Sequence, residues 1–140
     1  MHAINQEINI VQAATAHDID MAFVSLVQKG ANASIVVNDP FFVSRRDQIV
    51  ALAARHTMPA MYFSREFAAA GGLLSYGASL VDAARQGGIY TGKILKGEKP
   101  TDLPVMQSTK FEFVINLKTA KNLDLEIPPT VLATADEVIE

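Results

Sequence analysis

The sequence predicts an α/β protein in which a mostly parallel β-sheet is flanked by helices. Short apolar runs rich in β-branched residues alternate along the chain with segments that have one apolar helical face. This alternation is typical of βαβ units. The 140 residues are enough for a single domain, because domains of about this size bury roughly 68–70% of the surface that their unfolded chain exposes.

Four apolar runs are expected to form the first strands of the sheet. They cover residues 8–13, 34–38, 59–63 and 73–76. A helix is predicted between the first two runs, where Ile19, Phe23 and Leu26 share one face. Thr15 followed by Asp18 resembles a capping box at its start, and Gly30 is a typical C-terminal stop.

Three more helices are predicted in the middle of the chain. The first has Ser44 as its N-cap and Asp47 in its first turn, and its apolar side precedes Pro59. A short helix over 65–70 ends at a pair of glycines, and a longer helix over 80–96 ends at Gly97. Ala84, Gly88 and Gly92 recur every four residues in the longer helix, which leaves a flat stripe for close packing.

The last third of the chain has a different pattern. Two prolines make 99–104 an extended linker. Residues 110–117 then alternate, with Phe111, Phe113 and Ile115 on one side, as in a half-buried strand. A short helix over 117–123 and a C-terminal helix after the proline pair at 128–129 complete the expected elements.

The composition argues against several classes of function. The formal charge is −3 and the basic residues are scattered, so we expect no nucleic-acid partner. The chain has no cysteine, and its three histidines do not have metal-ligand spacing. The glycines near Lys93 only partly match a phosphate-binding loop, because Ile94 replaces the required Ser or Thr. We therefore expect no catalytic residues, no metal and no cofactor, and predict that the protein is not an enzyme.

The N-terminus lacks the pattern of a signal peptide. No basic region followed by an apolar run is present, and no segment approaches the roughly 20 apolar residues of a membrane span. If Met1 is the native start, a cytoplasmic location is expected.

Ligands of open parallel sheets bind beyond the carboxyl ends of the strands, so the loops that follow the predicted strands are candidate binding loops. Their side chains combine carboxylates, a guanidinium, an amide, a phenol and two aromatic rings, which suit a small polar or zwitterionic organic ligand. The candidate residues are Asn38, Asp39, Phe41, Phe42, Arg65, Glu66 and Tyr76.

Each candidate also has an ordinary structural explanation. Asp39 before Pro40 is a normal turn residue, and at least one of the two phenylalanines that follow is expected to cover the core. Arg65 and Glu66 are open to pairing with each other, and Tyr76 to an interface role.

Several stretches resemble a known family over essentially the whole chain. They are "NDPFF", "RRDQIVALAARHTMPAMYFSREFAAAGGLLSYGASL" and "GKILKGEKPTDLPVMQSTKFEFVINLKTAK". Their pattern is similar to the C-terminal half of bacterial ABC-transporter solute-binding proteins with the type I periplasmic-binding-protein fold. The resemblance implies a two-lobed periplasmic receptor that presents a small solute, such as an amino acid or aromatic carboxylate, to a membrane permease. It places the loop residues Asn38, Asp39, Phe41, Phe42, Arg65 and Glu66 in the cleft, and Tyr76 on the path of the hinge between the lobes.

The resemblance also implies an incomplete flavodoxin-like or Rossmann-like lobe. Residues 1–140 would be a single truncated C-terminal lobe, with 1–76 as the lobe core. Residues 77–98 would form a helix that normally lies in the other lobe, and 99–140 a linker, a return strand and a C-terminal helix. Family members are about twice this length.

Two alternatives to solute binding remain open. One is a non-catalytic fragment that only self-associates, as a homodimer that exchanges helix 80–96 or strand 111–117. The other is a receiver-like signalling domain with Asp39 as the phosphoacceptor, although the acidic pair expected after the first strand is missing.

Overall fold

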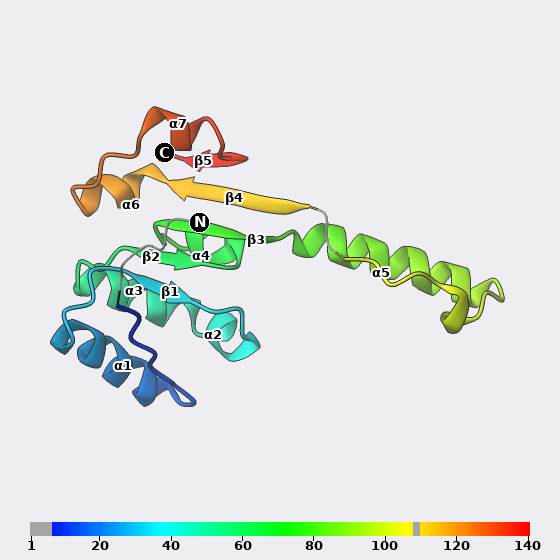
Figure 1. Cartoon of the computed structure of the whole chain (residues 1–140), viewed down its shortest axis with the longest axis horizontal. Helices are drawn as coiled ribbons and strands as arrows, with labels where there is room; N and C mark the ends of the chain where they lie inside the picture. The colour runs from blue at the N-terminus through cyan, green and yellow to red at the C-terminus, as the bar shows by residue number, and fades with distance from the viewer. Residues whose placement is uncertain (1–6, 108–109) are drawn as a thin grey trace.

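The computed structural model describes residues 7–107 and 110–140. Its centre is a five-stranded sheet in the order β1-β2-β3-β4-β5 (Figure 1). The first three strands are parallel, β4 is antiparallel to β3, and β5 is parallel to β4. The strands are β1 (Ser34–Val36), β2 (Ala60–Tyr62), β3 (Leu74–Ala78), β4 (Phe111–Asn116) and β5 (Glu137–Ile139). The predicted α/β class with a mostly parallel sheet is confirmed.

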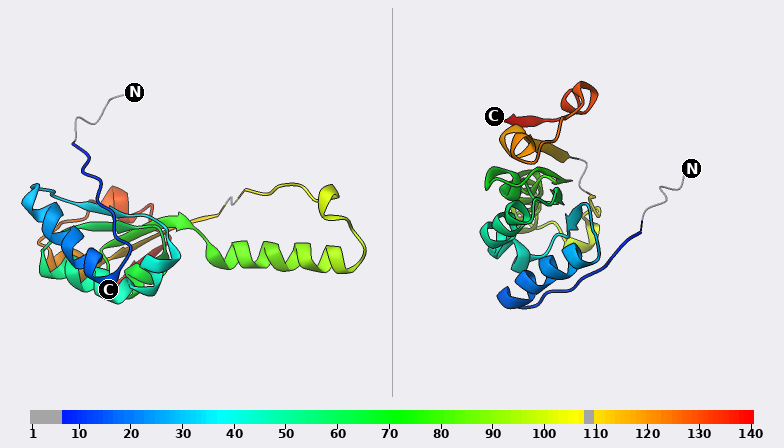
Figure 2. Two further views of the ribbon diagram at one scale, coloured as in Figure 1. Left: turned by 90° about the horizontal axis from the view of Figure 1, so that it is seen from below. Right: turned by 90° about the vertical axis from the view of Figure 1, so that its left-hand side faces the viewer.

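Helices precede or follow most strands. They are α1 (Ala16–Gln28), α2 (Pro40–Ser44), α3 (Arg46–Arg55), α4 (Arg65–Ala69), α5 (Leu80–Leu95), α6 (Leu117–Asn122) and α7 (Pro129–Leu132). Figure 2 shows α1, α3 and α4 gathered on one side of the strands, where α3 contacts both of the other helices. The described residues contain no helix that combines the length and apolar character needed to cross a membrane.

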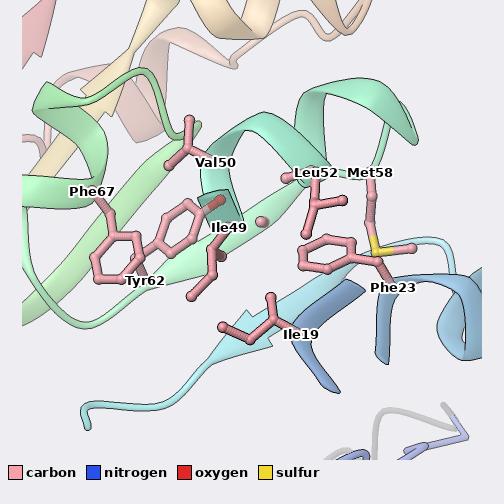
Figure 3. Close-up of a cluster of buried hydrophobic side chains, with 10 residues drawn as sticks. Ile19, Phe23, Ile49, Val50, Leu52, Met58, Tyr62 and Phe67 are labelled. Carbon is pink, nitrogen blue, oxygen red and sulfur yellow. The ribbon is translucent and has the colours of Figure 1, made fainter. Parts of the chain in front are cut away.

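The core lies between this helical layer and the first two strands (Figure 3). Ile19 and Phe23 of α1 meet Ile49 of α3, and Tyr62 of β2 stacks on Phe67 of α4 with ring centroids 4.6 Å apart. Each fully buried large apolar side chain contributes about 1.5–3 kcal/mol. The helical periodicity seen in the sequence therefore identifies the residues that hold α1 and α3 on the sheet.

The predicted capping box of α1 is present. Thr15 Oγ1 accepts a hydrogen bond from the Asp18 N–H at 3.2 Å, and Asp18 Oδ2 accepts one from the Thr15 N–H at 2.9 Å. The hydrogen bond with Thr15 lowers the pKa of the Asp18 carboxyl. Gly30 follows the helix with φ +71°, a left-handed conformation that glycine adopts without strain.

Residues 8–13 were predicted to form a strand, and this prediction is wrong. The segment is irregular, although its side chains still alternate: Ile8 and Ile10 are exposed, whereas Val11 and Ala13 are partly buried. A strand forms only where a neighbouring strand satisfies its backbone N–H and C=O groups. In the part of the chain that the structure describes, no strand pairs with this segment.

The start of the second long helix also differs from the prediction. Ser44 is not an N-cap but the last residue of α2, and its hydroxyl donates to the Phe41 carbonyl at 2.7 Å. Asp39 is the residue that caps a helix here, because Pro40 at the first helical position starts α2 early. Helix α3 begins at Arg46 without a side-chain cap.

The C-terminal third contains a strand that the sequence did not predict. The expected C-terminal helix is only the short α7, and the chain then forms β5 beside β4. Val114 and Ile115 are both buried, so the expected alternation fails in the second half of β4, which is covered on both faces. The linker is also not wholly extended, since Pro100–Asp102 forms a 3-10 turn.

Helix α5 projects away from the sheet (Figure 1). The chain returns beside it, and the Tyr90 hydroxyl donates to the Pro104 carbonyl at 2.5 Å. We call α5 with residues 96–107 the arm. No residue of α5 is buried, and Gly97 follows it with φ +104°. The predicted long helix and its glycine stop are therefore confirmed, and the helix leaves the rest of the structure.

Candidate functional site

A cavity of about 260 Å³ lies at the carboxyl ends of the parallel strands. Its lining comes from the ends of β1, β2 and β3, the start of α5 and the start of β4. The lining residues are Asn38, Phe63, Ser64, Tyr76, Gly77, Ala78, Leu80 and Phe111. This is the edge of the sheet at which open α/β proteins bind ligands. The volume is slightly below the roughly 300–1,000 Å³ of typical ligand pockets.

The cavity lining contains three aromatic rings, those of Phe63, Tyr76 and Phe111. The Tyr76 ring stacks on Phe111 with centroids 5.7 Å apart and planes at 16°, and Phe113 meets Tyr76 edge-on at 6.1 Å. Phe63, Tyr76 and Phe111 are each about half exposed. Their ring surfaces therefore remain available to an apolar or aromatic group in the cavity.

The shape of the cavity depends on a glycine in β3. A Cβ atom at Gly77 would lie 1.9 Å from the carbonyl oxygen of Phe63. Only glycine allows the backbone after β2 to come this close to β3. Gly77 therefore determines where Phe63 and Ser64 meet the cavity.

Of the seven predicted site residues, Asn38 and Tyr76 line the cavity. Asp39, the exposed neighbour of Asn38, uses Oδ1 to accept a hydrogen bond from the Phe41 N–H at 2.8 Å. Phe41 and Phe42 are partly buried and pack against the core cluster. The structure thus supports the core-covering explanation for the two phenylalanines and a helix-capping role for Asp39.

Arg65 and Glu66 do not line the cavity, and their partners differ: Glu137 lies outside the lining, whereas Ser64 belongs to it. The Arg65 guanidinium donates to both carboxylate oxygens of Glu137 at the start of β5, at 2.9 and 2.7 Å. This hydrogen bonding raises the pKa of Arg65. Glu66 accepts a hydrogen bond from the Ser64 hydroxyl, which lowers the pKa of the Glu66 carboxyl. The two charged residues therefore do not pair mainly with each other, and Arg65 joins α4 to the last strand.

Six lining residues were not among the predicted site residues. They are Phe63, Ser64, Gly77, Ala78, Leu80 and Phe111. A glycine inside a strand run signals close backbone approach and was the signal available for Gly77. Leu80 and Phe111 join the site only because both ends of the arm return to the same point, which local sequence does not reveal.

Comparison with known families identifies the chain. The family model described as "ABC transporter substrate binding protein" matches residues 1–139. The chain belongs to this family. This family of substrate-binding proteins is non-catalytic, so the chain is not an enzyme. Membership of this family also argues against the alternative of a receiver-like signalling domain. A comparison with curated proteins finds no match.

Solved structures of similar fold include three bacterial proteins. A conserved domain protein from Vibrio cholerae has a TM-score of 0.82 and 24% identity over 90% of this chain. An ABC domain from Streptococcus pneumonia in complex with L-Trp has a TM-score of 0.82 and 28% identity over 89%. The ligand-free, open CD0873 from Clostridium difficile, a substrate binding protein with adhesive properties, has a TM-score of 0.63 and 23% identity over 91%. In each case the match spans 42% of the other chain.

Proposed function

We propose that this chain is the solute-binding part of a bacterial ABC import system and that it holds a small organic solute in the cavity at the strand ends. The observation that carries the proposal is the cavity itself, with three half-exposed aromatic rings at the carboxyl edge of the parallel strands. Family membership supports the same function. The cognate permease would receive the solute from the whole protein.

The proposed solute is an amino acid or an aromatic carboxylate. The rings of Phe63, Tyr76 and Phe111 suit its apolar group. Asn38 in the lining and the adjacent Asp39 carboxylate suit its polar end. We propose Phe41, Phe42, Arg65 and Glu66, which do not line this cavity, for the outer rim of the complete cleft. The similar Streptococcus protein was solved with L-Trp, which supports a solute of this class.

We propose further that residues 1–76 form the core of one lobe, that 77–98 carry the helix that reaches toward a second lobe, and that 99–140 supply the linker, the return strand and the C-terminal helix. The projecting α5 and the 42% span of the relatives both support this division. The second lobe would close over the cavity and supply the rest of its wall. By family resemblance, the whole protein would work outside the cytoplasm, in the periplasm.

Titration of the ¹⁵N-labelled chain with L-Trp, L-Phe and aromatic carboxylates tests the solute proposal by NMR. We expect weak binding, with shifts concentrated on the amides of Phe63, Tyr76 and Gly77. Tyr76→Ala should abolish these shifts and Tyr76→Phe should retain them, because the second variant keeps the ring. Absence of any shift with every compound up to millimolar concentration would refute solute binding by this chain.

Self-association is a second candidate, favoured by the exposed face of α5. Val81 and Leu95 are 79% and 83% exposed on this face. Exposed apolar side chains that lie together on one surface mark interfaces. A homodimer that covers α5, or that exchanges it between two copies, would bury these apolar side chains without a solute.

A further inference from the structure

Two chain segments connect the arm to the sheet, and they lie side by side. We call these two segments the crossings. One leaves β3 at Ala78 and the other enters β4 at Phe111, which are partners in the antiparallel register. Beyond this pair, the Ser79 N–H donates to the Lys110 carbonyl at 3.0 Å. Ser79 is buried at this point. The two crossings therefore continue the β-ladder by one hydrogen bond before the chain enters the arm.

Asp82, in the first turn of α5, interacts with both crossings. Its N–H donates to Ser79 Oγ at 3.3 Å, and its carboxylate Oδ1 lies 3.0 Å from Arg85 Nη2 and 4.0 Å from Lys110 Nζ. The Asp82 side chain is only 11% exposed, whereas those of Arg85 and Lys110 are 58% and 69% exposed. We call Ser79, Asp82 and Lys110 the clasp.

Two features of its setting favour the negative charge of the Asp82 carboxylate. A negative charge in the first turn of a helix interacts favourably with the helix dipole. A carboxylate largely shielded from water is also screened less than an exposed one. Asp82 thus stabilises both the start of α5 and the contact between the two crossings.

The clasp borders the cavity. Ala78 and Leu80 flank Ser79 in sequence, Phe111 follows Lys110, and all three flanking residues line the cavity. Phe111 in turn stacks on Tyr76. A change in the direction of the arm would therefore displace Leu80 and Phe111, and with them one side of the aromatic wall.

We propose that Asp82 is a positioning residue that fixes the direction of the arm and thereby the shape of the cavity, without touching the solute. The effect on solute affinity rests on the proposed function. The effect on the contact between the crossings does not rest on the proposed function, because it concerns only contacts within the chain.

The test is hydrogen exchange of single amides, measured by NMR on the 140-residue chain. Asp82→Asn keeps the size of the side chain and removes its charge. We expect the Ser79 amide to exchange about tenfold faster, since the Ser79–Lys110 bond opens more often. The Tyr62 amide in β2 should keep its protection from hydrogen exchange, which would show that the variant is still folded. Asp102→Asn, a change of an exposed carboxylate elsewhere in the arm, is the matched control and should leave Ser79 unchanged.

Asp82→Glu retains the charge and should restore most of the Ser79 protection. Unchanged Ser79 exchange in Asp82→Asn, or an equal increase in Asp102→Asn, would overturn the proposal. If the wild-type chain binds L-Trp in the NMR titration, Asp82→Asn should weaken that binding several-fold. If it binds none, the solute proposal fails while the Ser79 exchange still decides the role of Asp82.

Discussion

The α-carbon of Gly77 faces the carbonyl oxygen of Phe63 so closely that a Cβ atom would lie 1.9 Å from it. Because the obstructing atom belongs to the backbone, it cannot rotate away as the end of a side chain would. Gly77 lies both in the sheet and in the cavity lining, so a substitution there would alter the packing of the sheet and the shape of the cavity together.

Gly77→Ala is expected to lower the free energy of unfolding by about 1–3 kcal/mol or more, the cost of overpacking a filled site. Urea denaturation measures this change. The matched control is Gly87→Ala on α5, where an added Cβ meets no atom within 4 Å. That control should stabilise the helix by up to about 1 kcal/mol, since alanine is the better helix former. Equal stability of the two variants would show that the Phe63 backbone yields without cost.

Two substitutions separate the capping role of Asp39 from its proposed role in solute binding. Its Oδ1 caps α2 through the Phe41 N–H, and loss of an N-cap costs about 0.5–2 kcal/mol. Asp39→Ala should therefore destabilise the protein by about 1 kcal/mol. Asp39→Asn keeps a good cap and should change stability by less than about 0.5 kcal/mol, while weakening binding of amino acids through loss of charge. Thermal unfolding and NMR titration on both variants check this, and unchanged binding in Asp39→Asn would limit Asp39 to capping.

The Glu66 carboxyl predicts a dependence of stability on pH. The hydrogen bond from Ser64 lowers its pKa in the folded state from the ordinary value of 4.5. A lowered folded-state pKa means that the contribution to stability is complete above pH 4.5 and is lost as the pH falls through the folded-state value. Ser64→Ala should therefore make stability less sensitive to pH below 4.5. Urea unfolding at pH 7 and at pH 3.5–4.5 tests this, and parallel pH profiles for wild type and variant would contradict it.

Self-association is tested by light scattering on the isolated chain. If the α5 face mediates a homodimer, the mass at micromolar concentration should be twice the 15.1 kDa of one chain. Val81→Lys should return the chain to a monomer, because it places a charge in the apolar face. The control is Met21→Lys, which adds the same charge at an exposed position of α1. A 15.1 kDa wild-type species would rule out the dimer at that concentration.

The parts of the fold that were predictable are those whose signals are local. The capping box at Thr15 and Asp18 lies within four residues, and the apolar face of α1 repeats over a few turns. Both are determined by the helix itself, so the sequence alone locates them. The short apolar runs that contain β1, β2 and the start of β3 are similarly continuous.

The missed features depend on contacts between distant segments. Residues 8–13 have the composition of a strand but lack a partner among the described strands, whereas Glu137–Ile139 is short and forms β5 because β4 lies beside it. Arg65 was assigned to the ligand from its loop, but its carboxylate partner Glu137 is 72 residues away. At the candidate site, the sequence predicted the edge of the sheet at which the cavity lies and two of its lining residues, Asn38 and Tyr76. The place of Phe111 in the lining depends on the fold and could not be predicted from the sequence.

The pairing of Ala78 with Phe111 gives the arm the topology of a very long hairpin connection. Residues 79–110 form a connection of 32 residues where two would be enough to join antiparallel neighbours. Loop-closure entropy rises by about 0.6 kcal/mol for each doubling of length, so these four doublings cost at most about 2.4 kcal/mol. Because this cost is modest, the β3–β4 connection is a suitable site for insertions. The segment between the two strands can be lengthened, shortened or exchanged while β3 and β4 keep their register.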